Sequence, residues 1–138
     1  MTRKNLHKIT FTLLILISSI SSKAQYASEE ELKSAANEMF DQENYVGSIK
    51  LFGQLLSNYP KDASYNYKYG ACLLFGSSDK DKSLRYLKFA VTKPNVDPLA
   101  YYYLAKAHHH NYAFSKAIVN YNLFKDKGSS KIVDKYDV

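Results

Sequence analysis

Residues 100–124 read AYYYLAKAHHHNYAFSKAIVNYNLF, two apolar helical patterns separated by a short break. Ala105 lies in the first pattern and Ala117 in the second. Small side chains in two successive helices let the helices approach closely where they cross. The stretch therefore predicts a pair of antiparallel helices.

The same pattern occurs twice more, earlier in the chain. The small residues of the first helices stand 34 and 35 residues apart, and those of the second helices 35 and 34 apart. They are Ala36, Gly70 and Ala105, and then Ser48, Ser83 and Ala117. One hairpin cannot bury its apolar face alone, so three repeats predict a stack of hairpins.

Helix-capping residues support the same division. Ser28 precedes the first repeat with Glu31 three residues later, which is the order of a capping box. Asp62 is placed to cap the second repeat, and Asp97 the third, where a proline follows it. Lys127 and the glycine after it predict the end of the last helix.

These repeats resemble the tetratricopeptide repeat (TPR) family, in units 29–62, 63–97 and 98–131. The residues that carry the resemblance are Ala36, Tyr45, Ser48, Phe52, Pro60, Gly70, Leu84, Ala90, Leu104, Ala105, Phe114, Ala117 and Tyr121. The resemblance implies an all-α fold, an α-solenoid of three TPR helical hairpins with about six antiparallel helices, over domain 25–131. Residues 132–138 are expected to start a further, truncated C-terminal helix.

The first 24 residues have the order of a secretory signal peptide. Basic residues come first, residues 9–20 are an apolar run, and Ser22 and Ala24 are the small residues before the expected cleavage point. The alternative is a retained membrane anchor, but a spanning helix needs about 20 apolar residues. We therefore expect an exported protein, in the periplasm or associated with an outer membrane.

The net charge of +6 belongs mostly to that signal. Removing residues 1–24 leaves 15 basic and 13 acidic residues, a net charge of +2. A nucleic-acid-binding protein would need a basic stripe on its folded part, and the repeats show none. Nucleic acid is therefore not an expected partner.

Enzymatic motifs are missing from the sequence, so we expect no enzyme, cofactor or metal. Cys72 is the single cysteine and lies in an apolar helical pattern typical of a buried thiol. His108, His109 and His110 are consecutive, so on a helix they point about 100° apart and do not converge on one ion.

The resemblance places the first helix of each hairpin on a concave surface, where an aromatic groove would bind a protein or peptide partner. The expected groove residues are Lys33, Asn37, Phe40, Tyr67, Ala71, Leu74, Tyr102, Lys106 and His109. One alternative is that a further helix or domain packs there. Another is that the tyrosines stack on a glycan such as peptidoglycan. A carboxylate clamp of the TPR type is not expected, because Lys68, Leu99 and Tyr103 replace three of its residues.

A closer resemblance concerns the order of the segments. A signal ending Ser-Lys-Ala-Gln followed by three such repeats is similar to the N-terminal part of envelope proteins that continue into a β-propeller and a peptidoglycan-binding OmpA-like domain. Some of those proteins serve type IX secretion. The resemblance implies an adaptor in the cell envelope, reaching peptidoglycan through domains outside these 138 residues.

Overall fold

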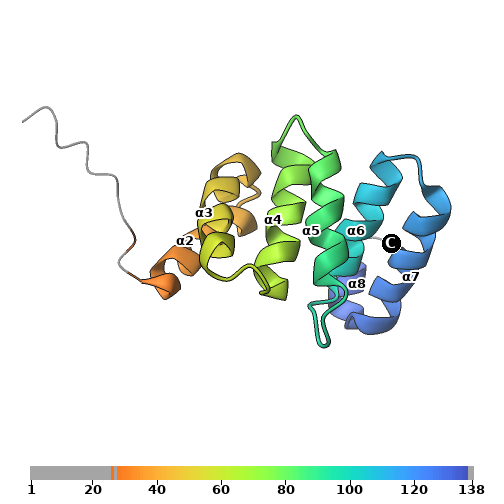
Figure 1. Cartoon of the computed structure of the whole chain (residues 1–138). Helices are drawn as coiled ribbons and strands as arrows, with labels where there is room; N and C mark the ends of the chain where they lie inside the picture. The colour runs from red at the N-terminus through yellow and green to blue at the C-terminus, as the bar shows by residue number, and fades with distance from the viewer. Residues whose placement is uncertain (1–25, 27, 137–138) are drawn as a thin grey trace, which may run out of the picture.

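The computed structural model describes residue 26 and residues 28–136, and this part of the chain contains seven α-helices and no strand (Figure 1). The prediction of an all-α fold is confirmed over these residues. The predicted signal peptide, residues 1–24, lies outside them. The helices are α2 (Glu29–Asp41), α3 (Tyr45–Asn58), α4 (Ala63–Gly76), α5 (Asp81–Ala90), α6 (Leu99–His110), α7 (Phe114–Lys127) and α8 (Ser130–Tyr136).

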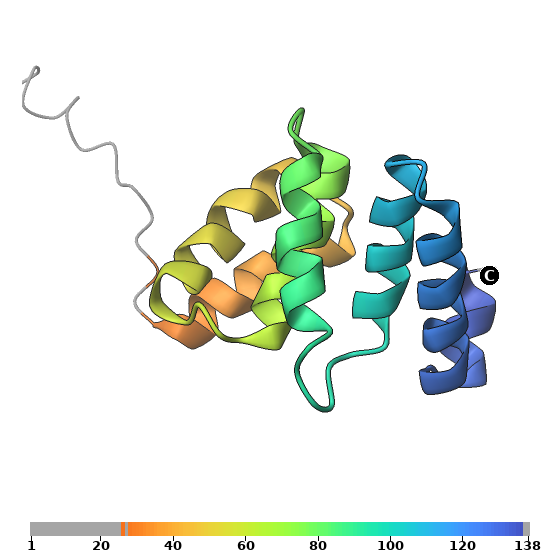
Figure 2. The same ribbon diagram turned by 45° about the vertical axis from the view of Figure 1, so that its right-hand side comes forward.

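Consecutive helices pack against one another as three hairpins, α2/α3, α4/α5 and α6/α7, which follow in a row (Figures 1 and 2). The first helices α2, α4 and α6 form one layer, here called the inner layer, which α8 joins at its end. The second helices α3, α5 and α7 form the outer layer. None of the described helices is both long and apolar enough to span a membrane.

Two of the predicted helix starts, at Ser28 and Asp62, are confirmed by side-chain caps, whereas the N-cap residue of α6 is Pro98, one residue after the predicted Asp97. Ser28 accepts a hydrogen bond from the N–H of Glu31 (3.2 Å), and Asp62 accepts one from Tyr65 (2.8 Å). Asp97 accepts one from the N–H of Leu99 at 2.9 Å. Each cap satisfies an amide that would otherwise lack a partner in the first turn.

The turns inside the first and third hairpins have the same backbone geometry. Glu43 and Tyr112, two repeat lengths apart, both adopt left-handed conformations, with φ of 57° and 56°. In both turns this residue's N–H donates to the carbonyl three residues earlier, at 2.9 and 3.0 Å. The next N–H donates to the carbonyl five residues earlier, at 2.8 and 2.9 Å. The two hairpins thus repeat in their backbone as well as in their sequence.

All six small residues predicted to lie at helix crossings are buried. The closest approach is at Gly70, where an added Cβ would lie 2.7 Å from Cγ of Leu87. Only glycine permits α4 and α5 to pack this closely. The large residues between hairpins, including Phe52, Leu55 and Leu87, are 0–1% exposed and fill the core.

The second hairpin differs from the other two at its turn. Here α4 ends at Gly76, and α5 begins only at Asp81, with no side-chain cap. Asp79 and Lys82 form an ion pair of 2.7 Å across this turn. The longer connection shortens α5 to 10 residues, against 14 in α3 and α7.

Candidate functional site

Three aromatic rings of the inner layer meet across the hairpins. Tyr103 of α6 lies edge-on to Phe40 of α2, with ring centroids 5.9 Å apart, and stacks on Tyr67 of α4 at 6.3 Å and 17°. The rings are only 7, 2 and 4% exposed for Phe40, Tyr67 and Tyr103. We call these three residues the inner aromatic cluster. It joins the first hairpin directly to the third.

Polar groups around this cluster are paired. The Tyr67 hydroxyl donates to Oδ2 of Asp97 at 3.3 Å, and burial, followed by the charge of Asp97, raises the pKa of Tyr67. Lys68 Nζ donates to Oδ1 of Asn37 at 2.6 Å. Burial lowers the pKa of Lys68, although nearby Asp41 opposes that change.

The short helix α8 covers one end of the inner layer through Tyr136. Its ring centroid lies 4.6 Å from that of Tyr102 and 6.0 Å from that of Phe124. Burial raises the pKa of Tyr103, and the charge and hydrogen bond of Tyr136 raise it further. Tyr136 therefore adds a hydrogen-bonded ring to the edge of the cluster.

Two adjoining hollows remain open beside α8, and we call them together the inner hollow. Both are bordered by Phe40, Asp41, Lys135 and Tyr136. One, of about 700 Å³, extends to Tyr102 and Lys106; the other, of about 630 Å³, extends to Asp97 and Lys131. The inner hollow thus combines aromatic walls with an acidic group from α2, Asp41, and basic groups from α8.

The predicted open groove is wrong at four of its residues. Phe40, Tyr67, Ala71 and Leu74 are 7, 2, 0 and 3% exposed, so they form core and do not face solvent. The physical reason is the contact between the first and third hairpins, which brings the inner faces of α2, α4 and α6 together. Of these four, Phe40 and Tyr67 still border the inner hollow.

The other five predicted groove residues lie in three different parts of the structure. Tyr102 and Lys106 border the inner hollow, where Lys106 Nζ lies 5.7 Å from the Tyr102 ring centroid. Lys33 forms a surface ion pair with Glu30 (3.1 Å), and Asn37 accepts the hydrogen bond from Lys68. His109 is exposed beside Phe114, with centroids 5.4 Å apart, away from the hollow.

Sequence reasoning missed Tyr136 and Lys135 as site residues. A signal was present, because Tyr67, Tyr102 and Tyr136 stand 35 and 34 residues apart, at the repeat spacing. Tyr136 thus holds the equivalent position in the next inner helix. Lys135 carries no comparable signal, since an exposed lysine in a short amphipathic segment is common.

Cys72 and the three histidines take the positions expected for structural residues. Cys72 is fully buried, and burial raises its pKa to about 12. His108 is buried, with its pKa lowered by burial and by Lys88, whereas His109 and His110 are exposed. Among the described residues, no group of three or more histidine, cysteine or acidic side chains could hold a metal ion.

A comparison of the chain with models of known protein families gave no match, and a comparison with curated proteins found no significant similarity. The resemblance of the repeats therefore rests on their own residues and spacing.

Proposed function

We propose that this chain is a non-catalytic protein–protein interaction scaffold built from three TPR-type hairpins. The repeated left-handed turns at Glu43 and Tyr112, together with the buried small residues at every helix crossing, support the TPR-type assignment. Stacked hairpins hold a fixed inner surface, which suits the binding of a peptide or helix.

The observation that carries this proposal is the inner hollow. Its walls are aromatic and largely rigid, because Phe40 packs on Tyr103, and Asp41 and Lys135 also border it. Buried or half-buried aromatic anchors surrounded by charged groups are typical of surfaces that bind proteins. A partner segment with one apolar side chain and charges of both signs would match this surface.

We place the scaffold in the cell envelope as an adaptor of a secretion or outer-membrane complex. The support is the signal-like order of residues 1–24 and the likeness to repeat modules that precede OmpA-like domains in type IX secretion. Glycan binding has less support, because Tyr67 and Tyr103 are buried against each other and offer no free face to a sugar ring.

Photocrosslinking in living cells tests the proposal. A photoreactive side chain at position 106, at the rim of the hollow, should capture one specific envelope protein, and the additional change Tyr102→Ala should abolish the product. The matched control is position 116, which is exposed on α7 outside the hollow. Capture of the same proteins from both positions, or capture unaffected by Tyr102→Ala, would contradict the proposal.

A further inference from the structure

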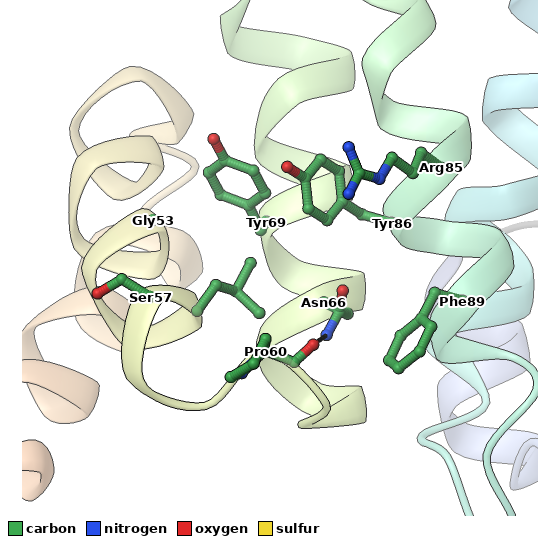
Figure 3. Close-up of a pocket in the computed structure, with 9 residues that line it drawn as sticks. Gly53, Ser57, Pro60, Asn66, Tyr69, Arg85, Tyr86 and Phe89 are labelled. Atoms are coloured by element: carbon green, nitrogen blue, oxygen red, sulfur yellow. Dashed lines mark hydrogen bonds between the residues drawn. The ribbon is translucent and has the colours of Figure 1, made fainter.

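A second groove lies on the outer layer, between α3 and α5 with α4 as its floor (Figure 3). It has a volume of about 560 Å³. Residues of α3 and the following loop, among them Gly53 and Pro60, form one wall, and Tyr86 and Phe89 of α5 form the other. No residue of this outer groove belongs to the inner hollow.

The α5 wall places one cation, Arg85, beside two aromatic rings, Tyr86 and Phe89. The Tyr86 ring lies edge-on to Tyr69 of the floor at 4.7 Å, and the Arg85 guanidinium lies 5.5 Å from the Tyr86 ring centroid. Lys93, in the loop after α5 and outside the groove lining, has its Nζ 4.3 Å from the Phe89 ring centroid. Figure 3 shows the Arg85 side chain running from α5 toward the ring of Tyr86.

The groove has almost no negative charge of its own. Helix α3 contains no aspartate or glutamate, and α5 contains only Asp81, at its N-terminal end. Arg85 makes no ion pair with any residue in the described part of the chain. An arginine held on an aromatic ring with its N–H donors unpaired is suited to bidentate binding of a carboxylate.

Gly53 keeps the groove open, although packing does not require a glycine there. An added Cβ at Gly53 would meet only Tyr69, at an ordinary contact distance of 3.6 Å, whereas at Gly70 it would clash with Leu87. Glycine inside a helix is less stable than alanine. Gly53 therefore weakens α3 at a position where its visible effect is to leave space above Tyr69.

The floor also carries a buried amide. Asn66 is 4% exposed, and its Nδ2 donates to the carbonyls of Pro60 (3.0 Å) and Asp62 (2.6 Å). In Figure 3 its amide nitrogen faces Pro60, and its amide oxygen faces the groove. The loop at Pro60 is thereby fixed, and an acceptor for a ligand N–H remains on the floor.

We propose that the outer groove binds an acidic peptide segment, with an apolar side chain seated over Gly53 and Tyr69 and a carboxylate held by Arg85. An extended peptide supplies the three features that the outer groove lacks: an acid for Arg85, an apolar side chain for the space over Gly53 and Tyr69, and a backbone N–H for Asn66. This site is independent of the inner hollow and of the proposed function.

The test is an NMR titration of the ¹⁵N-labelled chain with the capped peptide acetyl-Asp-Glu-Leu-Asp-Glu-Phe-amide. We expect saturable shifts at the amides of Gly53, Asn66 and Phe89. The neutral peptide, with every acid replaced by its amide, should bind about tenfold more weakly, because the charge-assisted contacts are lost. Raising the salt concentration should also weaken binding of the acidic peptide.

Variants connect the binding to the named residues. Arg85→Gln should lower the affinity for the acidic peptide at least about fivefold and leave the affinity for the neutral peptide unchanged. Gly53→Leu should block both peptides, and Gly53→Ala, which fits the observed space, should reduce binding without loss of fold. Lys116→Gln, an equal change of charge on the exposed part of α7, is the matched control and should have no effect.

Three outcomes of the peptide titrations would overturn the proposal. The first is equal affinity for the acidic and neutral peptides. The second is amide shifts that are confined to the inner hollow or absent at millimolar peptide. The third is an affinity for the acidic peptide that Arg85→Gln does not change. Tighter binding of an eight-residue oligothymidylate than of the acidic peptide would overturn it as well, because it would identify the groove as a nucleic-acid site. The melting temperatures of Arg85→Gln and Lys116→Gln should stay close to that of the parent chain, and that of Gly53→Ala should rise through helix propensity.

Discussion

The ring of Phe40 in the first hairpin lies against the ring of Tyr103 in the third, with centroids 5.9 Å apart and planes at 79°. These residues are 63 positions apart in the sequence. In a stack where each hairpin touches only its neighbours, such a contact would not exist. Here it joins the first hairpin to the third, beside the inner hollow that α8 borders.

Replacing Tyr103 tests this contact. Tyr103→Ala should lower the free energy of unfolding by about 3–5 kcal/mol, the usual cost of removing a buried aromatic side chain. Tyr103→Phe keeps the ring contacts and loses only the hydroxyl, so it should cost about 1 kcal/mol. Urea unfolding followed by circular dichroism measures both. Equal effects of the two substitutions would show that the ring contacts do not stabilise the fold.

Two helical glycines should respond in opposite directions to alanine. Gly70→Ala places a Cβ 2.7 Å from Leu87 and should destabilise the chain by about 1–3 kcal/mol, as overpacking does. Gly53→Ala meets no close contact and should stabilise it by about 1 kcal/mol through helix propensity. Thermal unfolding of the two variants, with the parent chain as reference, gives the comparison. A loss of stability in Gly53→Ala would mean that α3 packs more tightly on Tyr69 than described here.

The left-handed turn at Glu43 is strained by its side chain. Glu43→Gly should raise the free energy of unfolding by up to about 1 kcal/mol, because glycine adopts positive φ without steric cost. The control is Asp41→Gly, in the last residue of α2, which should destabilise by about 1 kcal/mol. Differential scanning calorimetry distinguishes these outcomes. A higher free energy of unfolding in Asp41→Gly would contradict the assignment of Asp41 as the last residue of α2.

Stability should fall in alkaline solution because of Cys72. Burial raises the pKa of its thiol from 9.0 to about 12, so between these values the unfolded chain loses a proton that the folded chain keeps. Stability is therefore fully present below pH 9.0 and should decline above it, by up to about 1.4 kcal/mol per pH unit. Tyrosines with pKa values raised by burial, among them the half-buried Tyr45 and the buried Tyr67, steepen the decline above pH 10.

The variant Cys72→Ala distinguishes the contribution of the thiol to the alkaline loss of stability from that of the tyrosines. It should flatten the stability profile between pH 9 and 10 and leave the decline above pH 10 in place. Urea midpoints measured at half-unit intervals of pH, under reducing conditions, provide the profile. If the variant and the parent chain decline in parallel from pH 9, the thiol of Cys72 is not the group that titrates.

Much of the fold could be predicted because local rules set it. Helix starts follow capping residues such as Ser28 and Asp62, and helix crossings follow small residues such as Ala36 and Gly70. These signals depend on neighbours a few residues away or on the other helix of the same hairpin. The repeat spacing then extends them along the chain.

The site could be predicted only in part, because it depends on how far the stack curves. Phe40 and Tyr67 occupy inner positions as expected, yet the contact of Phe40 with Tyr103 buries them. The distance between the first and third hairpins cannot be predicted from any local sequence pattern. The outer groove was not predicted at all, since Gly53, Tyr69 and Arg85 come together from three helices and no motif unites them.

The most direct test of the central claim, that the inner hollow binds a protein partner, is hydrogen exchange with and without the partner captured from position 106. The account predicts that peptides covering α6 and α8, residues 99–110 and 130–136, exchange more slowly in the complex, and that α3 and α5 are unchanged. Slower exchange only in α3 and α5, or in no inner helix, would contradict it.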